Sequence, residues 1–291
     1  VKPIIGIEAY VAPESRFDKK RVQWADGGED DVSGGGAYTH MTILAENNQG
    51  LANLFRLSSL ASLEGYYYKP RMDRELISRH ADGLIATTGC PGGEIQTRLR
   101  MGNYREALRA ASDYRDIFGA NNFFLEIMDH DIDVENRVKA DLLKLGKELK
   151  LPLLATNDLH YTHHEDAAAH AALLCVQSGT TLADPKRFKF DNDEFYLKTP
   201  AQMRELFKEL PESCDNTLLI AERCNVKLRE NENLLPAFPV PQGETEDSWL
   251  RKESVRGLLE KMGDRATEEY RTRINYELDV MANMGFPGYF L

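Results

Sequence analysis

The sequence predicts an α/β protein whose strands form a mostly parallel sheet or barrel. Short apolar segments of strand length alternate with longer segments of helical periodicity from residue 1 to residue 161, which is the pattern of βα units. Polar residues gather where these strands end, as they do when a site is built at the carboxyl edge of such a sheet. The chain has 291 residues, of which 42% are hydrophobic, so it can form one large domain or two smaller ones.

Five segments are expected to be strands because they are short, apolar and bounded by turn residues. The first strand alternates apolar residues on one face with Glu8 on the other face. A carboxylate in so apolar a strand is costly to bury alone, so Glu8 is a metal ligand, an arginine partner or an exposed edge residue. These five segments lie at residues 3–11, 38–45, 83–88, 122–128 and 153–156, and a turn with a further short strand is expected at residues 190–197.

Helices are expected where apolar residues recur every three or four positions. A polar, glycine-rich stretch at residues 14–36 is expected to be a flexible surface loop, with the acidic cluster at residues 26–31 in solvent. A proline-rich segment at residues 234–241 is expected to connect two domains. The expected helices lie at residues 47–64, 74–81, 104–118, 136–149, 165–176, 199–206, 215–224, 247–262 and 268–284.

The composition excludes some classes of protein. A formal net charge of −11 argues against a protein that coats nucleic acid, so any phosphate contact has to be local, through metal ions or a small basic patch. The 4 cysteines are dispersed without a C-x-x-C motif, which is typical of reduced thiols in a cytoplasmic protein. Neither a signal peptide nor an apolar run of membrane-spanning length is present in the sequence, so no membrane partner is expected.

The stretch Leu-Leu-Ala-Thr-Asn-Asp-Leu-His-Tyr, from residue 153 to 161, indicates a buried strand with a polar end. Asp158 and His160 are two residues apart, which on a strand directs both side chains to one face. A carboxylate oxygen and an imidazole nitrogen that converge in this way suit a divalent metal. The alternative is an Asn-Asp turn followed by a surface histidine.

Three further residues at the strand ends are candidate ligands. His40 lies in the second strand and is either a ligand or a hydrogen-bonded, inert histidine. Glycines around Cys90 present it after the third strand, as a thiolate ligand or as a small buried residue. His130 follows the fourth strand and is a weaker candidate, because its Asp-His-Asp sequence equally fits a turn. Their common position at strand ends favours a single metal cluster.

Several stretches together resemble one known family. The stretches ATNDLHY, TTGCPGGE, IIGIEAYVAP, YTHMTILAENNQGLANL and YELDVMANMGFPGYFL resemble the alpha (catalytic) subunit of bacterial replicative DNA polymerase III, and TTGCPGGE and RFKFDNDEFYLK resemble its actinobacterial type. Residues 1–236 resemble the polymerase-and-histidinol-phosphatase (PHP) domain, and residues 237–291 resemble a connector and the beginning of the palm domain. The resemblance implies a distorted (β/α) PHP barrel with C-terminal helices leading into the polymerase palm.

The resemblance also implies a set of metal ligands at the strand ends. Glu8 and Asp158 are expected to be catalytic as well as ligating. Divalent ions are implied, and thiolate and imidazole ligands favour zinc, with manganese or magnesium as alternatives. The family's first strand, with its H-x-H motif, is not found in this sequence, so the chain is expected to be an inactive piece of a longer protein. The implied ligands are Glu8, His40, Cys90, Asp158 and His160, with His130 as the weaker candidate.

The implied function is part of a DNA-directed DNA polymerase, a nucleotidyltransferase, whose PHP domain is a metal-dependent 3′→5′ proofreading exonuclease. The alternative is a catalytically inactive PHP scaffold that stabilises the polymerase. A free-standing small-molecule phosphatase is disfavoured, because it would not need the tail at residues 247–291. The implied partners are primer-template DNA, the palm, thumb and fingers of the polymerase chain, the sliding clamp and other replisome subunits.

Overall fold

The computed structural model describes residues 2–23, 33–228, 230 and 234–291. The chain forms two compact units, Val1–Lys227 and Leu228–Leu291. The acidic cluster expected in solvent at residues 26–31 lies outside the described residues. Each unit is considered by itself below.

The first unit is built on a mixed sheet, which in the described residues has six strands in the order β3-β1-β2-β4-β5-β6. Strand β2 is antiparallel to both of its neighbours, whereas the other three pairings are parallel. The predicted α/β class is therefore confirmed, and β2 is the exception to the expected parallel order. The strands are β1 (Gly6–Val11), β2 (Thr39–Ala45), β3 (Arg71–Met72), β4 (Leu84–Thr87), β5 (Phe123–Ile127) and β6 (Leu153–Ala155).

Burial differs between the middle and one side of this sheet. Every residue of β4 and β5 is buried, as expected for strands covered on both faces. Along β2, buried and half-buried residues alternate, and β1 has the same alternation in its second half. One face of the β1–β2 pair is therefore in the core, and the other face carries Glu8 and His40 toward solvent.

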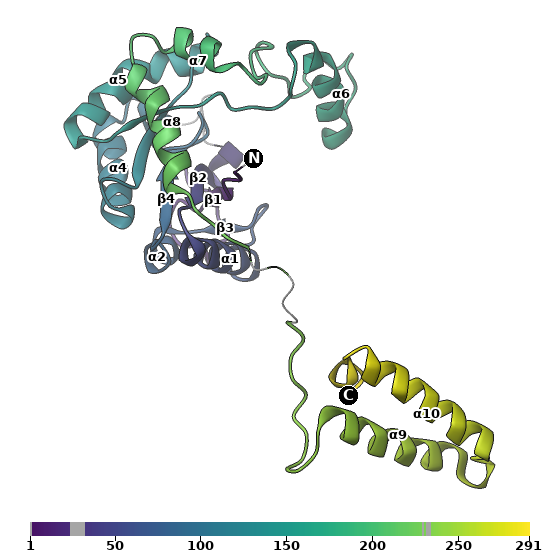
Figure 1. Ribbon diagram of the computed structural model, residues 1–291. Helices are drawn as coiled ribbons and strands as arrows, with labels where there is room; N and C mark the ends of the chain where they lie inside the picture. The colour runs from purple at the N-terminus through teal and green to yellow at the C-terminus, as the bar shows by residue number, and fades with distance from the viewer. Residues whose placement is uncertain (1, 24–32, 229, 231–233) are drawn as a thin grey trace. The chain divides into compact units, whose positions relative to one another are not determined.

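Several helices of the first unit lie around the sheet, whereas α6 lies apart from it (Figure 1). Most lie where periodicity predicts them, but the short helix α3 was not expected. Three of its buried residues, Glu94, Gln96 and Thr97, are polar, and its buried apolar residues are the single i, i+4 pair Ile95 and Leu99, which is a weak helical pattern. The helices are α1 (Asn48–Leu63), α2 (Arg74–Arg79), α3 (Glu94–Arg100), α4 (Tyr104–Phe118), α5 (Asp133–Leu149), α6 (Ala167–Ser178), α7 (Pro200–Leu206) and α8 (Pro211–Arg223), with 3-10 turns η1 (Ser33–Gly36) and η2 (His164–Asp166).

The second unit contains the two charged helices expected at the end of the chain. Helix α9 (Glu246–Met262) and helix α10 (Glu268–Asn283) pack side by side (Figure 1), joined by η3 (Gly263–Arg265) and followed by α11 (Pro287–Phe290). The ion pair between Arg251 and Asp279, at 2.8 Å, links the two long helices. Residues 234–241 form neither helix nor strand. A search of the described helices found none with the length and apolar character needed to cross a bilayer.

Candidate metal centre

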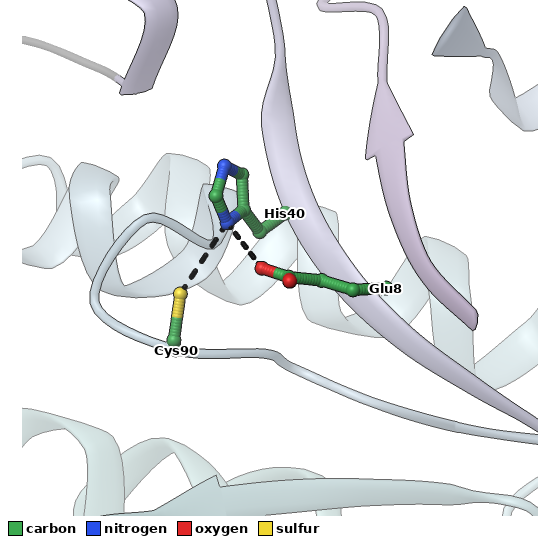
Figure 2. Close-up of side chains that lie close together, drawn as sticks. All are labelled: Glu8, His40 and Cys90. Atoms are coloured by element: carbon green, nitrogen blue, oxygen red, sulfur yellow. Dashed lines mark hydrogen bonds and ion pairs between the residues drawn. The ribbon is translucent and has the colours of Figure 1, made fainter. Parts of the chain in front are cut away.

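The pairing of β1 with β2 brings Glu8 and His40 together. In the antiparallel register Glu8 lies opposite Thr42, and His40 lies opposite Tyr10, so Glu8 and His40 are diagonal neighbours on the same face. The Oε1 atom of Glu8 is 2.6 Å from the Nδ1 atom of His40. Figure 2 shows the second ring nitrogen of His40 pointing away from this contact. The two candidates from separate strands therefore form one cluster.

A glycine-rich loop after β4 adds Cys90 to this cluster. Gly89 has φ +77°, and a Cβ atom there would lie 2.9 Å from the carbonyl oxygen of His40, so glycine allows the close approach. The backbone N–H of His40 donates to the carbonyl of Gly92 at 3.0 Å, which holds the loop on β2. As a result, Cys90 Sγ is 3.6 Å from His40 Nδ1 (Figure 2). One ligand atom each from Glu8, His40 and Cys90 lies within 4.8 Å of the other two.

The turn after β6 supplies Asp158, but not in the way the spacing predicted. Strand β6 ends at Ala155, so Asp158 and His160 are not on a strand, and the face-sharing argument was wrong. Asp158 instead has a left-handed backbone with φ +40°. It nevertheless lines the same cavity, of about 320 Å³, as Glu8, His40 and Cys90. His160 Nε2 is 3.6 Å from Asp158 Oδ1, although His160 is not among the residues that line the cavity.

Protonation in the cluster depends on burial and on the neighbouring carboxylates. The hydrogen bond from His40 lowers the pKa of Glu8 and outweighs the opposing effect of desolvation. Desolvation, helped by the charge of Asp158, raises the pKa of the Cys90 thiol to about 12. Without a cation, Cys90 is therefore a neutral thiol. A divalent cation at this point reverses that balance, because it favours the thiolate. The oxygen, nitrogen and sulfur donors suit such an ion.

Glu126 is a third carboxylate of the cavity, and it was not predicted as a site residue. It lies in β5, is buried, and accepts hydrogen bonds from the hydroxyls of Thr87 and Thr156, the latter at 2.6 Å. Burial raises its pKa. The sequence did hold a signal: Glu126 is the only charged residue of a five-residue apolar strand, which is the argument that identified Glu8.

His130 does not line the cavity of the candidate ligands, and both of its ring nitrogens have hydrogen-bond partners. Its Nδ1 atom lies 2.7 Å from a carboxylate oxygen of Glu135, and its Nε2 atom lies 2.9 Å from the carbonyl oxygen of Asn157. Because both partners are acceptors, both ring nitrogens have to donate, and only the imidazolium ion can do so. Desolvation lowers the pKa of His130, but the hydrogen bond and charge of Glu135 outweigh it and raise the pKa overall. In this arrangement His130 has no free lone pair for a metal.

A second group of possible ligands lies on the surface. His164, Asp193 and Glu194 each place one ligand atom within 4.8 Å of the others. The side chain of His164 is exposed. The group lies outside the cavity that Glu8 and His40 line.

Comparison with known proteins matches two segments of the chain to family descriptions. Residues 1–130 match "PHP domain", and residues 248–291 match "Bacterial DNA polymerase III alpha NTPase domain". The second match covers the tail that a free-standing phosphatase would not need. These matches place the cluster of Glu8, His40 and Cys90 within the PHP segment.

Curated relatives agree along the whole chain. Each of the three relatives cited here is named "DNA polymerase III subunit alpha". The relatives from Mycobacterium leprae and Saccharopolyspora erythraea are both 54% identical over 100% of this chain, and the one from Thermus aquaticus is 39% identical over 100% of it. The higher identity to the first two agrees with the actinobacterial resemblance. The chain spans only 25% of the first two relatives and 28% of the third. The chain therefore belongs to the bacterial DNA polymerase III alpha-subunit family, and it contains that family's PHP domain.

Proposed function

We propose that this chain provides the metal-dependent 3′→5′ proofreading exonuclease of a DNA polymerase III alpha subunit, which hydrolyses phosphodiester bonds at the 3′ end of DNA. The observation that carries the proposal is the convergence of Glu8, His40 and Cys90 within 4.8 Å in the PHP segment. Asp158, from a distant part of the sequence, lines the same cavity. Two carboxylates, an imidazole and a thiol at one edge of the sheet are typical of a hydrolytic metal site and are unusual in a region that serves only for packing.

The proposed ligands are Glu8, His40, Cys90 and Asp158, with His160 beside Asp158. A thiol and an imidazole 3.6 Å apart favour zinc over magnesium, and manganese remains an alternative. When bound, such ions neutralise the scissile phosphate and lower the pKa of water. His130 is left out of the proposed set because both of its ring nitrogens are engaged.

The two catalytic carboxylates have separate places in the cavity. Glu8 has a side chain that is 58% exposed, so it can reach a water molecule next to a bound phosphate and accept its proton. Asp158 is less exposed and is fixed on its left-handed turn, so it offsets positive charge at a constant position. His160, 3.6 Å from Asp158, orients that carboxylate.

The rest of the chain fits a larger polymerase. We assign residues 1–236 to the PHP domain and residues 237–291 to the connector and the beginning of the palm domain. These residues correspond to about a quarter of a relative's length. DNA-directed polymerisation is then an activity of the longer alpha-subunit chain. Primer-template DNA, the remaining polymerase domains, the sliding clamp and other replisome subunits are the proposed partners, in the cytoplasm.

One observation favours the second candidate, an inactive scaffold. Glu8 and His40 satisfy each other through their hydrogen bond at 2.6 Å, and Cys90 is a neutral thiol, so none of the three groups needs a cation. A site that has lost its metal would keep this arrangement and would stabilise the polymerase only through packing.

The test measures removal of a mismatched 3′ nucleotide by a full-length alpha subunit that contains this sequence. An Asp158→Asn variant is compared with the unsubstituted protein, and DNA synthesis is the internal control. We expect mismatch removal to fall by a factor of about 100 or more in the variant while synthesis is retained. If neither protein removes the mismatch, or both do so equally, the scaffold is the better description.

A further inference from the structure

Residues 186–190 read Lys-Arg-Phe-Lys-Phe, a basic and aromatic segment in a chain with net charge −11. Among the described residues no carboxylate forms an ion pair with Lys186, Arg187 or Lys189. Two of the acidic residues that follow have other partners, because Asp193 lies 3.2 Å from His164 and Glu194 lies 3.1 Å from Lys198. Three positive charges of this segment are therefore available to an anionic ligand.

Of the two aromatic rings in the segment, Phe190 packs against other rings and Phe188 is exposed to solvent. The Phe190 ring centroid lies 4.5 Å from that of Phe195, 4.6 Å from that of His160 and 5.1 Å from that of His170. Phe188 contacts Phe190 edge-on at 5.8 Å, and Phe188 itself is 62% exposed. The ring of Phe190 therefore supports an exposed ring, and the three basic residues are close to that ring in the sequence.

The same rings connect the segment to the candidate metal centre. His160, which Phe190 contacts, lies 3.6 Å from the Asp158 carboxylate. Phe195 stacks on His130 at 4.1 Å, and His130 donates to the carbonyl of Asn157, the residue before Asp158. The segment is thus fixed to the turn that carries Asp158, so a strand bound on it lies next to the cavity.

We propose that residues 186–190 form a subsite for the single-stranded 3′ end of DNA. Lys186, Arg187 and Lys189 bind backbone phosphates, and Phe188 stacks on a base. This combination binds any sequence, because every base has a π-face and every nucleotide has a phosphate. A 3′ end that has frayed from its template has this chemistry. The inference rests on the proposed exonuclease function and names the part of the molecule that holds its substrate.

The test measures binding of a fluorescein-labelled oligothymidylate to the 291-residue chain by fluorescence anisotropy, in EDTA so that no cleavage occurs. Phe188→Ala is expected to weaken binding about tenfold. Its control is Phe55→Ala, because Phe55 on α1 is also 62% exposed and is expected to leave the affinity unchanged. Far-ultraviolet circular dichroism checks that each variant folds.

A second comparison tests the phosphate contacts through their salt dependence. The triple variant Lys186→Gln/Arg187→Gln/Lys189→Gln is expected to reduce the slope of log affinity against log salt concentration by about 2, at about 0.7 per lost contact with a single strand. The control triple Lys144→Gln/Lys147→Gln/Lys150→Gln makes the same change in net charge on and beside α5, where all three residues are exposed, and is expected to leave the slope unchanged.

Either variant behaving like its control overturns the subsite, as does stronger binding to a blunt duplex than to the single strand. Failure of the subsite and failure of the exonuclease are distinguishable. If mismatch removal is found but these substitutions leave oligothymidylate binding unchanged, the subsite is wrong and the exonuclease proposal stands. If binding depends on residues 186–190 as expected but no mismatch is removed, the subsite stands and the exonuclease proposal is wrong.

Discussion

Replacing His130 by phenylalanine is expected to destabilise the turn that carries Asp158 without removing any proposed ligand. Phenylalanine keeps a ring that can stack on Phe195, as His130 does at 4.1 Å. The substitution removes the hydrogen bond to the carboxylate of Glu135, at 2.7 Å, and the hydrogen bond to the carbonyl of Asn157, at 2.9 Å. The contact with Glu135 is buried and the contact with Asn157 is partly buried, so water does not replace them fully.

The magnitude follows from these two contacts. A buried hydrogen bond between charged groups contributes about 1.5–3 kcal/mol net, and one with a neutral acceptor about 1 kcal/mol, so the loss is about 3 kcal/mol. It is not larger, because the backbone N–H at residue 130 still donates to Glu135 at 2.8 Å. The exposed His164→Phe is the control, and it is expected to change stability by less than about 0.5 kcal/mol.

Urea unfolding of the 291-residue chain at several pH values is the assay. The pKa of His130 is raised in the folded protein, so its charged contacts contribute fully below the unfolded value of about 6.5 and are lost as pH rises through the folded pKa. The stability difference between the original protein and His130→Phe should therefore shrink as pH rises. A difference below about 1 kcal/mol at pH 6, or one that does not change with pH, would refute the reasoning.

Three further predictions concern the metal site and the core. Zinc affinity should rise about tenfold per pH unit through Cys90 alone, because a thiol with a pKa near 12 has to release its proton when the ion binds. Calorimetry should therefore find that zinc binding releases about one proton fewer from Cys90→Ser than from the original protein. Release of equal numbers of protons contradicts this prediction. Gly89→Ala should lower stability by about 1–3 kcal/mol in urea unfolding, since residue 89 has φ +77°; an unchanged midpoint contradicts this. Arg16→Met should cost about 3 kcal/mol in the same assay, because it leaves the buried Asp73 carboxylate, now 3.0 Å from Arg16, without its cation; a loss below about 1 kcal/mol contradicts this.

Of the six strands of the described sheet, all but β3 were predicted, because they are short and apolar, and most helices were predicted because their apolar residues recur every three or four positions. The sequence missed α3 because Ile95 and Leu99 are its only buried apolar residues and the other buried ones are polar: Glu94 is satisfied by Arg74 at 2.6 Å and by Arg98 at 2.9 Å. A single apolar pair is a weak pattern, and the partner Arg74 lies 20 residues away in the sequence. The two-residue strand β3 is likewise too short to leave a pattern.

The candidate site was predictable where chemistry alone identified the residue. An acid in an apolar strand pointed to Glu8, and the same reasoning applied to Glu126 would have found the third carboxylate of the cavity. The i, i+2 argument for Asp158 and His160 was wrong because Thr156 and Asn157 leave the strand. No local pattern could show that both nitrogens of His130 face acceptors, since one of them, the Asn157 carbonyl, is 27 residues away.

The most direct test of the metal centre is cobalt binding by the 291-residue chain. A cobalt ion held by the Cys90 thiolate gives a sulfur-to-metal charge-transfer band in the near ultraviolet. We predict this band in the original chain and in Cys175→Ser, whose cysteine is buried in α6, and its loss in Cys90→Ser. A band that persists in Cys90→Ser, or the absence of any band in the original chain, would contradict a metal centre built on Glu8, His40 and Cys90.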